Sequence, residues 1–246
     1  MDYFTMHEIK YIQSLGQKKF RQQEGLFIAE GPKLVNDLLE MKNSSIQEIF
    51  ALKEWIEDNK KIADSYQVVE ITTIELEKIS QLSSPNQVVA VVKKIAIDEN
   101  IQVKGKFTLV LDNIQDPGNM GTIIRIADWY GIDQIVCNTQ SADMYNPKVI
   151  QSTMGSIARV KVFYTDLSDW LSKQKGISIY AAMLNGDDVT SMQKIKEGII
   201  VIGNESKGIS DDVLKLISKK ITIPQKGKAE SLNAAVATGI ILSHLL

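Results

Sequence analysis

Arg125 stands in an apolar helical pattern that directly follows a polar loop. The loop comes after the apolar run 107–111 and contains turn-forming residues at 116–118. Asn119 is predicted to cap the helix, whose apolar residues recur at positions 120, 123, 124, 127 and 130. Ligands of open α/β proteins bind where a strand ends and a helix begins, so Arg125 is a candidate for chemistry. Alternatively, Arg125 pairs with Asp128 on a solvated helix face.

Three further strand-like runs end in polar, glycine-containing segments. They are Leu184, Asn185 and Gly186; Gly203, Asn204 and Glu205; and Ile223, Gln225, Ser231, Leu232 and Asn233. Glycine lets a ligand approach the backbone, whose amides and carbonyls can then bind it. The alternative is that these are ordinary connections, with Ser210 capping one helix and Ser231 or Asn233 capping the last.

Composition and motifs exclude several other kinds of site. The chain has neither GxGxxG nor GxxxxGK[ST], and no cysteines or histidines at metal-ligand spacing, so we expect no classical nucleotide loop and no metal. The single Cys137 is predicted to be a buried structural thiol. A net charge of -2 leaves any nucleic-acid contact to local clusters such as Lys18, Lys19 and Arg21. With no signal peptide and no apolar run long enough to span a membrane, we expect a cytoplasmic protein.

The elements that must position these residues lie in two regions that differ in their sequence pattern. From residue 107 on, strand-like runs at 107–111, 134–137, 158–164, 178–184, 198–203 and 220–224 alternate with helical patterns. This alternation predicts an α/β fold whose parallel sheet carries helices on both faces. The looser pattern of residues 1–93 predicts a small α/β domain, with helices at 8–23, 32–41 and 55–66 and strands at 26–29, 47–52, 68–71 and 88–93. Residues 94–105 are the expected linker, and residues 106–246 the second domain.

Three segments of the second part, DPGNMGTIIRIADWYG, VIGNESKGIS and IPQKGKAESLNAAVATG, resemble in that order the motifs of the SpoU/TrmH family of RNA 2'-O-ribose methyltransferases. The resemblance covers residues 107–246. The front segment is similar to the L30e-like substrate-binding domain of the two-domain members that act on ribosomal RNA.

The resemblance implies a C-terminal trefoil knot, a homodimer, S-adenosylmethionine as cofactor and RNA, most often ribosomal RNA, as partner. By motif position it implies catalytic roles for Arg125, Asn119, Glu205, Ser231 and Asn233. It also implies that the methyl donor contacts Leu184, Asn185, Gly186, Gly203, Ile223, Gln225 and Leu232. Gln225 departs from the methionine that is common in the family, and Ala234 and Ala235 replace the usual valine and serine.

Methyl transfer to a ribose 2'-hydroxyl needs the two reactants held in line and a proton removed. An arginine, with a pKa above about 12, rarely accepts that proton. We therefore expect Arg125 to bind the adjacent phosphate and stabilise the developing alkoxide, while Glu205 orients Arg125 or a neighbouring amide. Three alternatives remain: a transfer-RNA 2'-O-methyltransferase, a non-catalytic RNA-binding or ribosome-assembly module, and a different α/β nucleotide-binding enzyme. The last is disfavoured because the chain lacks phosphate-loop glycines.

Overall fold

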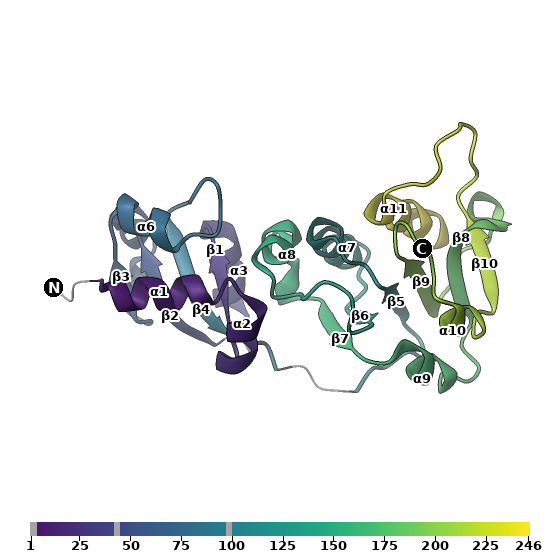
Figure 1. Cartoon of the computed structure of the whole chain (residues 1–246), viewed down its shortest axis with the longest axis horizontal. Helices are drawn as coiled ribbons and strands as arrows, with labels where there is room; N and C mark the ends of the chain where they lie inside the picture. The colour runs from purple at the N-terminus through teal and green to yellow at the C-terminus, as the bar shows by residue number, and fades with distance from the viewer. Residues whose placement is uncertain (1–3, 42–44, 97–99) are drawn as a thin grey trace. The chain divides into compact units, whose positions relative to one another are not determined.

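The computed structural model describes residues 4–41, 45–96 and 100–246, which fall into two compact units (Figure 1). One unit holds the described part of Met1–Ala96 together with Tyr145–Ala158, and the other holds the described part of Ile97–Met144 together with Arg159–Leu246. Within the residues described, no helix has the length and apolar content that crossing a bilayer requires.

The first unit is built on a four-stranded sheet in the order β1 (Leu26–Glu30), β4 (Val88–Lys93), β2 (Ile46–Ala51) and β3 (Val68–Glu70). β4 is antiparallel to β1 and β2, and β3 is parallel to β2. The connecting helices are α1 (Met6–Ser14), α2 (Lys18–Glu24), α3 (Pro32–Glu40), α4 (Lys53–Asp58), α5 (Lys60–Ala63) and α6 (Thr73–Ile79). Apolar residues of α1 and α6 form a core with this sheet, including Ile9, Ile12, Phe50, Leu76 and Ile79.

Helix α8 (Pro147–Thr153) packs on β1 although it is distant in sequence from the rest of this unit. Tyr145, just before α8, stacks against Phe27 of β1 with ring centroids 4.8 Å apart. The Tyr145 hydroxyl also accepts a hydrogen bond from the backbone N–H of Ile95 at 3.0 Å. The predicted domain limits of 1–93 and 106–246 assign α8 to the second domain, whereas its contacts place it with the first unit.

Arg21 is not part of an exposed basic cluster, contrary to the prediction for Lys18, Lys19 and Arg21. Its side chain is 1% exposed and donates hydrogen bonds to the carbonyls of Leu15 and Gly16, at 3.1 and 2.7 Å. These carbonyls lie where the predicted single helix 8–23 breaks into α1 and α2. The guanidinium therefore satisfies the broken helix end, and only Lys18 and Lys19 of the cluster are exposed.

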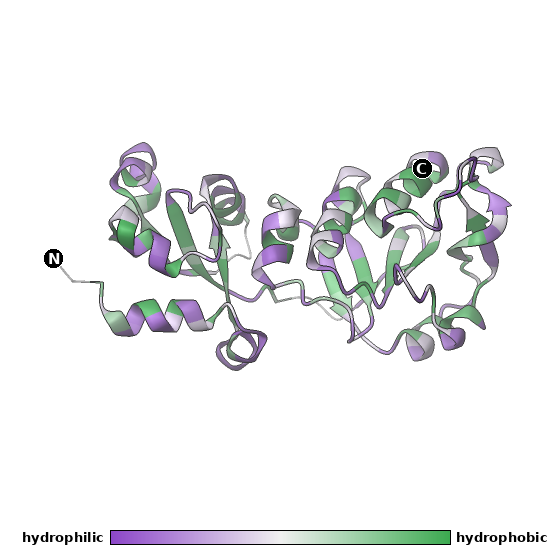
Figure 2. Cartoon of the chain, turned by 45° about the horizontal axis from the view of Figure 1, so that its top comes forward, coloured by the Kyte–Doolittle hydropathy of each residue, from purple (hydrophilic) through white to green (hydrophobic). Residues whose placement is uncertain are grey.

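The second unit contains a six-stranded sheet, and all of its strands are parallel. The strand order is β10 (Lys219–Thr222), β8 (Ile179–Asp188), β9 (Gly198–Gly203), β5 (Phe107–Asp112), β6 (Gln134–Cys137) and β7 (Lys161–Tyr164). The predicted parallel α/β fold is thus confirmed, and the apolar character of the strands is clear in Figure 2. Cys137 is fully buried, and burial raises the pKa of its thiol, as expected for a structural cysteine.

Helices cover both faces of this sheet. Val110, Val136 and Val201 pack in a core that includes α9 (Leu167–Ser172) and α10 (Asp211–Leu214). Their strand neighbours point to the opposite face because side chains alternate along a strand. That side is covered by α7 (Pro117–Trp129) and α11 (Ala234–Leu245), which also pack on each other (Figure 1). Short 3-10 turns at Ser156–Ala158 and Val189–Ser191 complete the described elements.

Most predicted elements exist, with differences besides the break between α1 and α2: the helix predicted at 55–66 is divided into α4 and α5. The strand predicted at 158–164 begins only at Lys161, because Ser156–Ala158 forms a 3-10 turn. The strand predicted at 178–184 continues to Asp188, where its end pairs with β10 after a register shift. Helix α6 was not predicted, although Thr72 and Glu75 form a capping box at its start. The expected linker 94–105 has no helix or strand where it is described, and residues 97–99 lie outside the described part.

Glu30 is a buried carboxylate at the end of β1 and is 6% exposed. It accepts hydrogen bonds from the Ser80 hydroxyl and, at 2.8 Å, from the backbone N–H of Gln81. Burial raises the pKa of Glu30, and the two hydrogen bonds oppose this shift. The carboxyl group therefore anchors the segment after α6 to the sheet, with a protonation state that depends on folding.

The raised pKa of Glu30 predicts how the stability of this unit depends on pH. Its contribution is fully present below the ordinary carboxyl pKa and is lost as the pH rises through the folded-state pKa. Replacing Glu30 with glutamine should flatten this dependence, because an amide keeps hydrogen-bonding atoms in place but does not titrate. The measurement is the opening free energy of β1 and β4 amides by hydrogen exchange at several pH values. The exposed Glu40→Gln is the control, and an unchanged pH slope in Glu30→Gln would contradict the assignment.

Candidate active site

Helix α7 begins one turn earlier than predicted, and this frees the Asn119 side chain. Asp116 is the N-cap: its carboxylate accepts a hydrogen bond from the Asn119 backbone N–H at 2.8 Å, and Pro117 occupies the first helical position. The prediction that Asn119 caps the helix is therefore wrong. Its side chain is left to make contacts outside the helix.

Asn119 joins two segments that are far away in sequence. Its Nδ2 donates to Glu205 Oε1 at 2.6 Å, and its Oδ1 accepts from Asn233 Nδ2 at 2.7 Å. Asn233 also caps α11 as predicted, because its Oδ1 accepts from the N–H groups of Ala235 and Val236. These contacts use both ends of the Asn119 amide and fix its orientation. The structure thus brings together three of the predicted residues, one from each motif.

The turn that carries Glu205 is held closed by Asn204. The backbones of Asn204 and Gly208 exchange two hydrogen bonds, at 3.0 and 2.9 Å, and the Asn204 Oδ1 accepts from the N–H groups of Ser206 and Lys207. Asn204 Nδ2 donates to the Asn113 carbonyl at 2.8 Å, which links this turn to the loop after β5. Asn113 has a φ of 65°, an uncommon backbone conformation for a residue other than glycine.

Asp112, the last residue of β5, ties the segment after β9 to the loop after β6. This carboxylate is 3% exposed and accepts hydrogen bonds from the Ser210 N–H and hydroxyl, both at 2.7 Å, and from Asn138 Nδ2 at 3.0 Å. Ser210 therefore bonds Asp112 instead of capping α10 with its side chain. Asp112, Asn113 and Asn138 are not among the predicted site residues. An aspartate directly after a buried apolar strand was the available signal.

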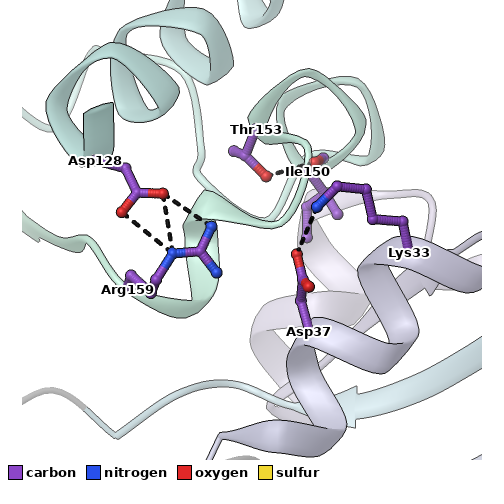
Figure 3. A network of polar contacts seen from close by, with 6 residues as sticks. All are labelled: Lys33, Asp37, Asp128, Ile150, Thr153 and Arg159. Atoms are coloured by element: carbon purple, nitrogen blue, oxygen red, sulfur yellow. Dashed lines mark hydrogen bonds and ion pairs between the residues drawn. The ribbon is translucent and has the colours of Figure 1, made fainter.

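Arg125 is exposed on α7 and makes no hydrogen bond or ion pair with any described residue. The alternative that it pairs with Asp128 is not supported, because the Asp128 carboxylate faces Arg159 instead (Figure 3). Arg159 Nη2 lies 2.8 Å from Asp128 Oδ2, and its Nε donates to both carboxylate oxygens at 3.0 and 3.2 Å. Figure 3 also shows the surface pair of Lys33 and Asp37 on α3, at 3.1 Å. Glu205 contacts Asn119 and not Arg125, so the expectation that Glu205 orients a neighbouring amide fits and a Glu205–Arg125 contact is absent among the described residues.

The other predicted residues follow β8, β9 and β10, which are neighbours in the sheet. Leu184 and Leu232 are exposed apolar side chains, at 70% and 47%, and Ile223 is half-buried. Gln225 Nε2 donates to the carbonyls of Gly227 and Ala229, at 3.0 and 2.7 Å, and so shapes the loop before α11. Ser231 and Asn185 are exposed, and neither has a side-chain hydrogen bond within the described chain.

The glycines at this edge serve the chain's own packing. A Cβ atom at Gly203 would lie 2.5 Å from the Gly208 carbonyl carbon and 2.6 Å from the Ile209 nitrogen. A Cβ atom at Gly186 would lie 2.5 Å from the Lys220 carbonyl carbon. The expectation that these glycines leave room for a ligand is corrected accordingly: at both positions, another stretch of backbone occupies the space.

Residues 106–243 match the SpoU rRNA Methylase family, and residues 7–90 match the MRM3-like substrate binding domain. The chain belongs to the SpoU rRNA methylase family. It is 29% identical over 241 residues to the 23S rRNA (guanosine(2553)-2'-O)-methyltransferase RlmP of Bacillus subtilis, covering 97% of this chain and 95% of that protein.

Two further rRNA methyltransferases extend the comparison. A 23S rRNA (uridine(2479)-2'-O)-methyltransferase of Streptomyces viridochromogenes is 28% identical over 243 residues, covering 93% of this chain and 85% of that protein. The crystal structure of an AdoMet-bound rRNA methyltransferase from Sinorhizobium meliloti has a TM-score of 0.88 and 30% identity, covering 100% of this chain and 96% of that one. The two curated relatives differ in the nucleotide named, so family membership alone does not fix the target.

A substitution at Gly203 tests the tight backbone packing at the end of β9. Gly203→Ala should lower the stability of the second unit by about 1–3 kcal/mol, the usual cost of forcing an extra methyl group into packed surroundings. Gly227→Ala is the matched control, because no atom lies within 4 Å of its added Cβ. Hydrogen exchange of the β9 amides measures the difference. Equal stability of the two variants would show that the Gly208–Ile209 backbone yields easily.

Proposed function

We propose that this chain transfers a methyl group from S-adenosylmethionine to a ribose 2'-hydroxyl of ribosomal RNA. The observation that carries the proposal is the hydrogen-bonded cluster of Asn119, Glu205 and Asn233, which joins the three motif segments at the carboxyl edge of the sheet. Similarity along both parts of the chain to rRNA 2'-O-methyltransferases, and to an AdoMet-bound structure, supports it.

Unmodified 23S ribosomal RNA transcribed in vitro tests the reaction directly. With methyl-labelled S-adenosylmethionine, the protein should label one site that resists alkaline cleavage, because a methylated 2'-oxygen cannot attack the neighbouring phosphate. Calorimetric titration with S-adenosylmethionine separates the alternatives. An absence of donor binding would refute the methyltransferase. Donor binding with label only on transfer RNA would identify transfer RNA as the substrate instead.

Leu184, Asn185, Gly186, Gly203, Ile223, Gln225 and Leu232 are the proposed donor-binding residues. They fit a nucleoside-like group, because exposed apolar side chains at 184 and 232 accompany backbone segments that end three neighbouring strands. When bound, the donor supplies an electrophilic methyl group. The proposed role of the protein groups is to bind it by backbone amides and carbonyls and to exclude water.

Asn119, Glu205 and Asn233 are proposed to position the acceptor. The fixed Asn119 amide presents a preorganised dipole, and Glu205 and Asn233 prevent it from turning. Ser231, next to this cluster in sequence, has an uncommitted hydroxyl that can bind the ribose. Arg125 is proposed to bind the adjacent phosphate and stabilise the developing alkoxide, because its guanidinium is exposed and stays charged.

Arg125→Ala should leave donor affinity nearly unchanged and reduce methyl transfer by roughly a hundredfold or more, the scale for losing one preorganised electrostatic group. Arg159→Ala is the matched control: it removes an exposed guanidinium already paired with Asp128 and should keep most activity. Single-turnover kinetics with ribosomal RNA and donor calorimetry measure both. Arg125→Lys distinguishes the roles, because lysine keeps the charge but lacks the planar fork. Substantial rescue by lysine would favour proton transfer over phosphate binding.

The domain at residues 1–93 is proposed to be L30e-like and to bind the RNA substrate, with residues 94–105 as linker and 106–246 as methyltransferase domain. The match of residues 7–90 to a substrate binding domain supports this, and Lys18 and Lys19 are its exposed cations on α2. Changing both to glutamate should raise the KM for ribosomal RNA several-fold and leave donor affinity unchanged. Lys60→Glu with Lys61→Glu, on α5 of the same unit, is the matched control. Equal effects of the two double substitutions on the KM for RNA would show that α2 has no special role in RNA binding.

Three expectations of the family complete the proposal. A homodimer through α7 and α11 is supported by the exposed Trp129 and Val236, at 85% and 51%, and Trp129 lies one turn after Arg125. Sedimentation equilibrium of the protein and of Trp129→Glu tests it. A trefoil knot is proposed from membership of the family that the sequence resembles, and tracing residues 179–233 in a crystal structure decides it. A cytoplasmic location follows from the RNA substrate and is tested by cell fractionation.

A further inference from the structure

A pocket of about 480 Å³ opens beside the proposed active site, at the carboxyl ends of β9, β5, β6 and β7. Its volume falls within the roughly 300–1,000 Å³ typical of small-molecule sites. The turn Asn204–Gly208 separates the two places: Lys207 and Gly208 line the pocket, while Glu205 of the same turn contacts Asn119. The proposed donor residues follow β8, β9 and β10 and do not line it.

Side-chain hydrogen bonds join the loops that frame the pocket. Asp112 accepts three hydrogen bonds, from Ser210 and Asn138. Asn138 Oδ1 accepts from the Asn113 N–H and from the N–H and hydroxyl of Ser141, at 2.8 to 3.1 Å. These hydrogen bonds hold the loops after β5, β6 and β9 together, so this side of the pocket is formed before any ligand arrives. Asn113 Oδ1, in the lining, is a buried acceptor with no hydrogen bond in the described part of the chain.

Most of the side chains inside this frame that make no hydrogen bond are neutral, and one is a cation. The side chains of Thr139, Gln140, Thr165 and Ser168 and the Lys207 ammonium have no hydrogen bond to any residue the structure describes. Each carboxylate of the lining accepts at least one hydrogen bond: Asp112 as above, Asp166 from the Asp169 N–H at 2.9 Å, and Asp212 from Lys215 at 2.7 Å. No group of three or more histidine, cysteine, aspartate or glutamate side chains that could hold a metal ion occurs among the described residues.

We propose that this pocket binds an unstacked base of the substrate RNA, with Lys207 on the phosphate of the same nucleotide. The inference rests on the proposed function and adds a specificity site to it. Hydroxyl and amide groups both donate and accept hydrogen bonds, as base edges do, and sequence-specific RNA recognition works on bases splayed out of the helix. One ammonium matches one phosphate charge. The shared turn 204–208 then couples the base held in the pocket to the cluster that faces the reacting ribose.

Filling the pocket tests this directly. Ser168→Leu places an apolar side chain among its free polar groups, whereas Ser172→Leu makes the same change on the same helix, at an exposed position outside the pocket. With in vitro transcribed 23S ribosomal RNA, Ser168→Leu should raise the KM for RNA at least tenfold relative to Ser172→Leu, the scale of about one lost polar contact. The calorimetric affinity for S-adenosylmethionine should be the same in both.

Lys207→Met provides a second variant that does not depend on Ser168→Leu folding. Its control is Lys196→Met, an exposed lysine before β9 that does not line the pocket. Lys207→Met should weaken RNA binding and lower its dependence on salt by about one phosphate contact. If the wild type methylates RNA and each variant matches its control in KM and salt dependence, the pocket assignment is wrong. Loss of donor affinity in the pocket variants would overturn it as well, by assigning the pocket to the donor. A wild type without turnover or donor binding would instead refute the proposed function.

Discussion

The side chain of Asn204 is the contact on which the carboxyl edge of the second sheet depends. Its Oδ1 closes the turn after β9 by accepting two backbone hydrogen bonds, and its Nδ2 ties that turn to the Asn113 carbonyl after β5. The same turn carries Glu205 on one side and Lys207 on the other. A single amide therefore fixes both the group that orients Asn119 and the cation that lines the neighbouring pocket.

The sequence predicted this fold well where the signal was local. Buried parallel strands read as short apolar runs, and β5, β6 and β9 lie at or within one residue of their predicted bounds. The same logic could have placed the start of α7, because aspartate followed by proline is a common N-cap and first helical position. Taking Asn119 as the cap overlooked this pair. Asp116 provides the cap, and Asn119 is left for long-range contacts.

What the sequence could not supply are contacts between distant segments. Asn119 is separated from Glu205 by 86 positions and from Asn233 by 114, so only the fold brings the three together. Arg21 reads as a surface cation beside Lys18 and Lys19, yet it is buried on the carbonyls of Leu15 and Gly16. Residues 145–158 read as part of the second domain and pack with the first unit. The Arg21 contacts are local, five and six positions away, whereas the partners of Asn119 and of residues 145–158 are distant in sequence.

Charge limits how this protein can hold an RNA. A net charge of -2 gives the chain no overall electrostatic attraction for RNA, so phosphate contacts depend on local exposed cations such as Lys18, Lys19, Arg125 and Lys207. Such contacts add affinity but carry no sequence information. Discrimination must then come from groups that recognise shape and base edges. A preformed polar pocket beside a fixed amide cluster supplies this, because rigid neutral groups lose little conformational entropy on binding and reject a base that leaves them unpaired.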